Sequence, residues 1–267
     1  MNNFSQYSTL EDLVNEIRAT GKYSFSLEEA KKEFKISEKA LNQALFRLKN
    51  KNKISPIRKG FYAIITPEYS KQGMLPPHLF IDDLMQSLEK KYYVGMFSAA
   101  ALYGAAHQQP MEYYVITEKP ALRNIKTPKL SINFFIKQDW PESGVIQKKT
   151  DAGYINVSTP ELTALDLLTY GNFGINRVLT ILEELVEEMK SSDLTKTARI
   201  YSPTSSVQRL GYLIDKVIGN EKLAIALRKI VNDRKTYPTP LLKSANTKGS
   251  LDSDWNIYKN TELESDL

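Results

Sequence analysis

The arrangement of apolar and polar residues predicts three short helices and a hairpin in the first 66 residues. Apolar residues at helical spacing follow Thr9, a favourable N-cap, and predict a helix that ends at Gly21. Residues 26–29 have the sequence of a capping box and predict a second helix that extends to about Phe34. In residues 53–64, two β-rich runs flank a basic turn that contains a glycine, which predicts a hairpin.

A third helix is expected to begin after Ser37, only a few residues beyond the second. One face of this helix is apolar and consists of Ala40, Leu41, Ala44, Leu45 and Leu48. Two helices separated by so short a turn have the spacing of a helix-turn-helix. Because a hairpin follows at once, the whole segment predicts a winged helix-turn-helix in which the hairpin is the wing.

The remainder of the chain predicts both helices and strands. Helices are expected at about 77–90, 98–106, 159–170, 174–189, 205–218 and 220–233. Strands are expected at 113–117, 130–136 and 154–157, with an edge strand at 255–258. The apolar run 92–106 is interpreted as a buried helix because it is too short to span a bilayer. The predicted fold class is α+β, with an N-terminal winged helix-turn-helix followed by a larger mixed α/β C-terminal domain.

The length of 267 residues is sufficient for two domains. A glycine and two consecutive prolines after the predicted hairpin indicate a hinge between them. The predicted division is a DNA-binding domain at 1–67, a hinge at 68–76 and a C-terminal domain at 77–267. Within the last of these, residues 234–250 are polar and are expected to be largely irregular.

The excess positive charge is confined to one short segment. The chain has a net charge of +5, and residues 31–59 contain ten Lys or Arg against two Asp or Glu. Cations gathered in this way are suited to DNA because each one placed on a phosphate releases condensed counterions. The charge distribution therefore favours double-stranded DNA as a partner of the N-terminal region.

The polar face of the third predicted helix carries side chains that could read base edges. Asn and Gln bind adenine through two hydrogen bonds, and Arg or Lys binds guanine in the same way. The alternative is an ordinary solvated helix face, but the adjoining basic hairpin favours DNA binding. The predicted DNA-binding residues are Ser37, Lys39, Asn42, Gln43, Arg47, Lys49, Asn50, Arg58 and Lys59.

Composition argues against several classes of function. The chain has no cysteine and only two histidines, His78 and His107, so neither a thiolate nor a histidine-rich metal site is expected. No signal-peptide pattern follows Met1, which together with the absence of a long apolar run predicts a cytoplasmic protein without membrane contact. No cofactor is expected.

Sequence motifs of enzymes are also missing, and the chain is predicted not to be an enzyme. A triad of Ser98, His107 and Asp166 has no nucleophile elbow, and no phosphate-binding glycine motif occurs. Gly249-Ser250 is too close to Asp252 and Asp254 for the spacing of a nucleotidyltransferase. Asp166 lies on a largely apolar predicted helix and is expected to satisfy a buried polar partner. A hydrolase or transferase hidden in the C-terminal domain is the weakest hypothesis.

The small-residue helix and the polar turn after it have two interpretations. Small side chains at 99–106 allow a helix to approach a sheet closely, and Pro110 would end the segment. A hydrogen-bonded turn is favoured over a ligand site for the polar residues of this segment, which are Ser98, Tyr103, His107, Gln108 and Gln109.

Several motifs between residues 76 and 266 resemble, in their order along nearly the whole chain, those of one family. They are Pro76-Pro77, 80–85, 92–95 running into 98–110, 153–154 with 157–161, 163–167, 210–213 and a closing pattern from Trp255 to Asp266. This order of motifs resembles the AbiEi antitoxins of AbiE abortive-infection toxin–antitoxin systems, and the resemblance assigns Ser98 to Gln109 to the antitoxin-domain motif.

The resemblance implies a phage-defence antitoxin that is also a transcriptional autorepressor. Its winged helix would bind inverted repeats in its own promoter, and its C-terminal domain would oppose a nucleotidyltransferase-like toxin without a stable complex. A toxin-binding interaction module in which DNA contact is secondary is the alternative hypothesis.

Overall fold

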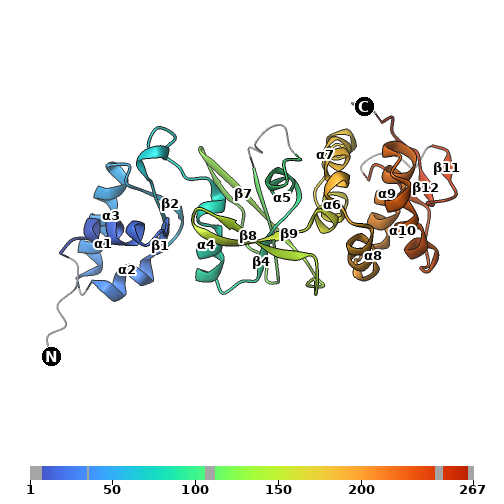
Figure 1. The fold of residues 1–267 in the computed structure, drawn as a ribbon. Coiled ribbons are helices and arrows are strands. Elements are labelled where there is room, and N and C mark those ends of the chain that lie inside the picture. The colour runs from blue at the N-terminus through green and yellow to red at the C-terminus, as the bar shows by residue number, and fades with distance from the viewer. Residues whose placement is uncertain (1–7, 35, 106–111, 244–248, 264–267) are drawn as a thin grey trace. The chain divides into compact units, whose positions relative to one another are not determined.

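The computed structural model describes residues 8–34, 36–105, 112–243 and 249–263 (Figure 1). The chain divides into two compact units, each made of segments that are distant in sequence. The first unit consists of Met1–Tyr92, Leu122–Phe134 and Gln147–Asn156. The second consists of Tyr93–Ala121, Phe135–Ile146 and Val157–Leu267. The proposed domain boundaries at residues 67 and 76 stay a prediction.

The N-terminal part of the first unit contains three helices and a three-stranded antiparallel sheet of order β1-β3-β2 (Figure 1). In chain order the elements are α1 (Leu10–Ala19), β1 (Ser24–Ser26), α2 (Leu27–Glu33), α3 (Glu38–Asn50), β2 (Ile54–Arg58) and β3 (Phe61–Ile64). The predicted N-caps Thr9, Ser26 and Ser37 are confirmed, since each side chain accepts a hydrogen bond from the backbone three residues on. Gly60, with φ +79°, makes the turn between β2 and β3.

The helices of this part pack on a shared apolar core. Leu13, Leu41, Leu45 and Phe25 belong to one buried cluster, with Phe25 only 1% exposed. The predicted apolar face of the third helix needs one correction, because Ala40 in its first turn is exposed while Leu41, Leu45 and Leu48 are buried. Strand β1 was not predicted, because three residues are too few to display a two-residue repeat.

The first unit also contains the segment after the hairpin. It holds two 3₁₀ turns, η1 (Pro67–Tyr69) and η2 (Pro77–Leu79), followed by α4 (Ile81–Ser87). The predicted helix 77–90 is therefore wrong at its start, where prolines favour the tighter turn. The adjacent carboxylates have separate partners, since Asp82 accepts from the Tyr92 hydroxyl and Asp83 from the Ser24 hydroxyl, both at 2.7 Å. Burial raises the pKa of Asp83.

A six-stranded sheet has the strand order β6-β7-β5-β4-β9-β8. Its strands are β4 (Tyr92–Val94), β5 (Tyr113–Thr117), β6 (Ile125–Thr127), β7 (Leu130–Ile136), β8 (Val145–Thr150) and β9 (Gly153–Ser158). The predicted strands at 113–117 and 130–136 are confirmed with their bounds. The interpretation of 92–106 as one helix is wrong, because Tyr92–Val94 is a strand and α5 (Met96–Leu102) follows it.

Helices α6 to α10 of the second unit lie together (Figure 1), and their buried side chains form much of its main core. They are α6 (Pro160–Thr169), α7 (Ile175–Glu188), α8 (Ser191–Ile200), α9 (Thr204–Tyr212), which continues as the π-helical segment η3 (Leu213–Ile218), and α10 (Glu221–Asn232). The predicted start of α6 is confirmed, with Thr159 as N-cap and Pro160 in the first turn. Helix α8 was not predicted.

A small sheet of order β10-β12-β11 lies near the end of the chain, with strands β10 (Thr239–Pro240), β11 (Leu251–Asp252) and β12 (Ile257–Tyr258). Residues 255–258 were predicted as an edge strand, but β12 is the central strand, so that prediction is wrong. Trp255, just before it, is 0% exposed and packs on Gly211 of α9. A Cβ atom at position 211 would lie 1.9 Å from the Trp255 ring, so only glycine fits there.

Among the helices in the described ranges, none combines the length and apolar character that a bilayer crossing requires.

Candidate functional site

The exposed face of α3 gathers four of the predicted DNA-binding side chains. Lys39, Asn42, Gln43 and Arg47 line one shallow depression on this face. Their positions follow from the opposite face, where three leucines are buried in the core and fix the rotation of the helix. The result is a row of amide and cationic groups that are all exposed to solvent.

The other predicted DNA-binding residues occupy different places in the same unit. The Ser37 hydroxyl accepts from the Ala40 amide at 3.2 Å and thereby begins α3. Lys49 lines a second depression, and Asn50 is exposed at the last position of the helix. Arg58 and Lys59 are exposed at the β2–β3 turn.

The cations of the basic segment fall into a paired and an unpaired group. Lys31 lies 3.7 Å from Glu28 and 3.6 Å from Glu38, and both Lys51 and Lys53 form ion pairs with Glu11. The hydrogen bond from Lys53 holds the pKa of Glu11 below its usual value.

In the part of the chain that the structure describes, the unpaired group has no carboxylate within ion-pair distance. Its members are Lys32, Lys39, Arg47, Lys49, Arg58 and Lys59. These six are the cations of the segment that remain available to a polyanion.

Two further residues, one in each of these depressions, were not predicted. Phe46 lies among the polar side chains of α3 and is 61% exposed. Its signal in the sequence was its position outside the leucine stripe, three residues after Gln43. Lys129, in the turn between β6 and β7, lines the same depression as Lys49. No local sequence signal connects these two lysines, because the fold of the first unit brings them together.

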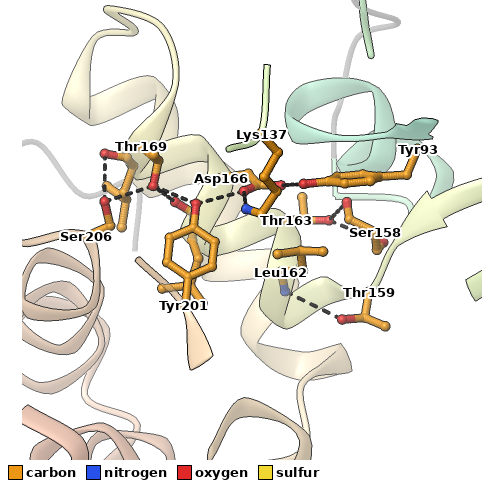
Figure 2. A network of polar contacts seen from close by, with 12 residues as sticks. Tyr93, Lys137, Ser158, Thr159, Leu162, Thr163, Asp166, Thr169, Tyr201 and Ser206 are labelled. Atoms are coloured by element: carbon orange, nitrogen blue, oxygen red, sulfur yellow. Dashed lines mark hydrogen bonds and ion pairs between the residues drawn. The ribbon is translucent and has the colours of Figure 1, made fainter. Parts of the chain in front are cut away.

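A buried polar network forms the second candidate site, around Asp166 on α6 (Figure 2). The Asp166 side chain is 0% exposed. Its Oδ1 lies 3.0 Å from Lys137 Nζ and accepts from the Tyr201 hydroxyl at 2.7 Å, while its Oδ2 accepts from the Tyr93 hydroxyl at 2.8 Å. The prediction that Asp166 satisfies a buried polar partner is confirmed.

The aromatic members of this network are held as neutral phenols. Burial, reinforced by the charge of Asp166, raises the pKa of Tyr93 and of Tyr201 well above the ordinary tyrosine value. The Lys137 ammonium lies 4.2 Å from the centre of the Tyr201 ring, where the ring face attracts a cation. One carboxylate thus neutralises one buried lysine and accepts from two hydroxyls, which is an arrangement suited to holding a fold.

A second set of hydrogen bonds joins α5 and α6 to the neighbouring strands. Ser98 Oγ accepts from the Tyr114 amide at 2.9 Å, and the Tyr103 hydroxyl donates to the Ser158 carbonyl at 2.8 Å. Figure 2 shows Ser158 beside Thr163, and their hydroxyl oxygens lie 2.6 Å apart. Ser98 and Tyr103 therefore have structural partners.

The rest of the predicted antitoxin-domain motif, His107, Gln108 and Gln109, lies outside the described residues. The hypothetical triad therefore cannot be assembled from described positions, and the two members that are described bond to different partners.

A cavity of about 510 Å³ lies beside the Asp166 network. Segment 136–143, the end of α6 and the connection between α8 and α9 line it, and its walls include Lys137, Trp140, Tyr170 and Tyr201. Over the described ranges, no group of three or more acidic or histidine side chains is placed to hold a metal ion. The walls of the cavity therefore contain aromatic rings, and the charge of Lys137 in them is offset by Asp166.

Comparison with known proteins gives a family match over part of the chain. Residues 93–216 match the family model described as the AbiEi antitoxin C-terminal domain, which confirms the resemblance found in the sequence. A crystal structure of the RV2827C protein from Mycobacterium tuberculosis is similar over 92% of this chain and 89% of that chain, with a TM-score of 0.64 and 16% sequence identity. That likeness concerns the fold alone. No curated protein matches the sequence significantly.

Proposed function

Because the chain carries an AbiEi-type antitoxin C-terminal domain at residues 93–216, we propose that this protein is an antitoxin that also represses transcription of its own operon. In this proposal α2 and α3 act as a helix-turn-helix, the β2–β3 hairpin acts as the wing, and α3 enters the major groove of promoter DNA. The partner opposed by the antitoxin domain is a nucleotidyltransferase-like toxin. The protein acts in the cytoplasm, in phage defence.

One observation carries the DNA-binding half of the proposal. The face of α3 that is turned away from the core presents Asn42, Gln43 and Arg47 side by side, together with the unpaired Lys39. Such a face can place amide and guanidinium groups on base edges while neighbouring cations neutralise phosphates. Because water solvates these exposed cations and no carboxylate offsets them, they remain available to phosphate.

The proposal is tested by measuring binding of the full-length protein to duplexes from its own promoter and to unrelated duplexes of equal length. The promoter is expected to bind more tightly, with an affinity that falls steeply as salt rises. Arg47→Ala should weaken promoter binding by about 1–3 kcal/mol, the cost of losing one base contact. Lys222→Ala is the matched control, because Lys222 is an exposed cation on α10 in the other unit. Equal affinity for promoter and unrelated DNA at physiological salt would contradict the repressor function.

The antitoxin half needs a separate readout, because the two activities are assigned to different parts of the chain. Co-expression with the toxin encoded beside it should restore growth for both the wild type and Arg47→Ala, although only the wild type represses the promoter. Loss of growth rescue in Arg47→Ala would show that neutralisation depends on DNA binding. Recovery of a stable stoichiometric complex from the same cells would favour the toxin-binding module instead.

A further inference from the structure

Phe46 is the one large apolar side chain in the depression on α3. It is 61% exposed, whereas Leu41, Leu45 and Leu48 on the opposite face are buried. It follows Asn42 by four residues and Gln43 by three, so these side chains are neighbours on the helix surface. With so much of its ring in solvent, Phe46 contributes little to the core, and its place in the fold does not explain it.

The surroundings of Phe46 indicate what it would contact. A surface for another protein usually has an apolar centre made of several side chains, whereas Phe46 is a single apolar side chain among amides and cations in this depression. The only carboxylate in the depression, Glu38, lies 3.6 Å from Lys31, which offsets its charge. In the major groove, the C5-methyl group of thymine projects among hydrogen-bond acceptors and next to phosphates. An exposed ring flanked by donors and cations matches that arrangement.

We infer that Phe46 is a specificity-determining residue that packs against a thymine methyl group while its neighbours Asn42, Gln43 and Arg47 bond to adjacent base edges. The inference rests on the proposed DNA-binding function and deepens it. Apolar contact distinguishes thymine from the other bases through the methyl group alone. The contact therefore vanishes when thymine is replaced by uracil, which differs only in lacking that group.

The experiment begins by selecting the preferred duplex of the full-length wild type from a random library. Each thymine of the selected duplex is then replaced in turn by uracil, and affinities for the wild type and Phe46→Ala are measured by fluorescence anisotropy. For the wild type, one or two replacements should weaken binding by about fourfold, the equivalent of one buried methyl group. Phe46→Ala should bind the thymine duplex more weakly by at least that factor, and should bind thymine and uracil duplexes equally.

Two controls separate this result from a general defect. Ile225→Ala removes an apolar side chain that is 59% exposed on α10, and it should leave the thymine dependence unchanged. Phe46→Ala should keep the thermal stability of the wild type and its salt-dependent binding to unrelated duplexes.

The possible outcomes distinguish the inference from the function on which it rests. If a preferred duplex is selected but its uracil replacements weaken binding of the wild type and of Phe46→Ala equally, the inference is overturned. The repressor function is preserved in that case. A change of oligomeric state in Phe46→Ala, without an effect on thymine dependence, would assign the ring to a protein interface. Failure to select any preferred duplex would overturn both proposals.

Discussion

The exposed face of α3 and the network around Asp166 both contain several polar side chains. The cationic side chains are unpaired on α3, but the charged side chains are paired in the network. On α3, Lys39 and Arg47 are exposed, and within the described ranges no carboxylate lies at ion-pair distance from either. In the second unit, the buried Asp166 is bonded to Lys137 and to two tyrosine hydroxyls. An unpaired surface cation costs little in water, whereas an unpaired buried charge costs several kcal/mol. The unpaired cations of α3 are therefore available to a ligand at little cost in stability, whereas the buried charge of Asp166 has to be paired for the chain to fold.

The largest effect that tests this comparison is expected from Asp166→Ala. Removing the carboxylate leaves Lys137 and two tyrosine hydroxyls without their shared acceptor. Breaking a buried pair in this way should lower the free energy of unfolding by about 3–5 kcal/mol, measured by chemical denaturation. DNA affinity of the fraction that remains folded should be unchanged, because the cations of α3 are untouched.

A double variant is the control for Asp166→Ala. Asp166→Leu combined with Lys137→Met replaces both charges with apolar groups, and it should be more stable than Asp166→Ala because no unpaired charge is left. If the single variant loses less than about 1 kcal/mol, the buried pair contributes no more than a surface ion pair, and the contrast between the two regions is lost.

Both regions contain a helix whose first turn is capped by a hydroxyl side chain. A smaller effect is expected when this cap is removed from α3. Ser37→Ala removes the side-chain acceptor of the Ala40 amide at the beginning of α3. Loss of an N-cap should destabilise the protein by about 1 kcal/mol, and it should also weaken DNA binding because Lys39 lies in the first turn.

Ser37→Asn supplies a different capping acceptor and should restore both properties. Thermal unfolding and promoter binding, measured on the same preparations, check this expectation. A loss of affinity in Ser37→Asn with full stability would show that the Ser37 hydroxyl contacts DNA directly.

The features that could be predicted from the sequence are those fixed by local interactions. The N-caps Thr9, Ser26 and Ser37 were predicted because a cap and the backbone amide that donates to it lie within four residues of each other. The orientation of α3, and with it the exposure of Asn42 and Arg47, followed from the repeat of its leucines.

Features set by distant residues could not be predicted in the same way. Strand β4 is three residues long and pairs in parallel with β9, through Val94 and Val157, so its conformation depends on a partner about sixty positions away. The apolar character of 92–106 alone predicted a helix there. In the same way, the sequence predicted that Asp166 has a buried partner, but tertiary packing determines that the partner is Lys137.

The smallest expected effect compares two lysines that differ in their partners. Lys59 at the β2–β3 turn belongs to the unpaired group, whereas Lys53 forms an ion pair with Glu11. Lys59→Ala should reduce the slope of log affinity against log salt by about 0.9, the value for one lost phosphate contact on duplex DNA. Lys53→Ala should change the slope less, because its charge is already offset by a carboxylate. Equal changes in slope for the two variants would show that the ion pair between Lys53 and Glu11 opens on DNA. Pairing in the free protein would then not determine which cations contact phosphate.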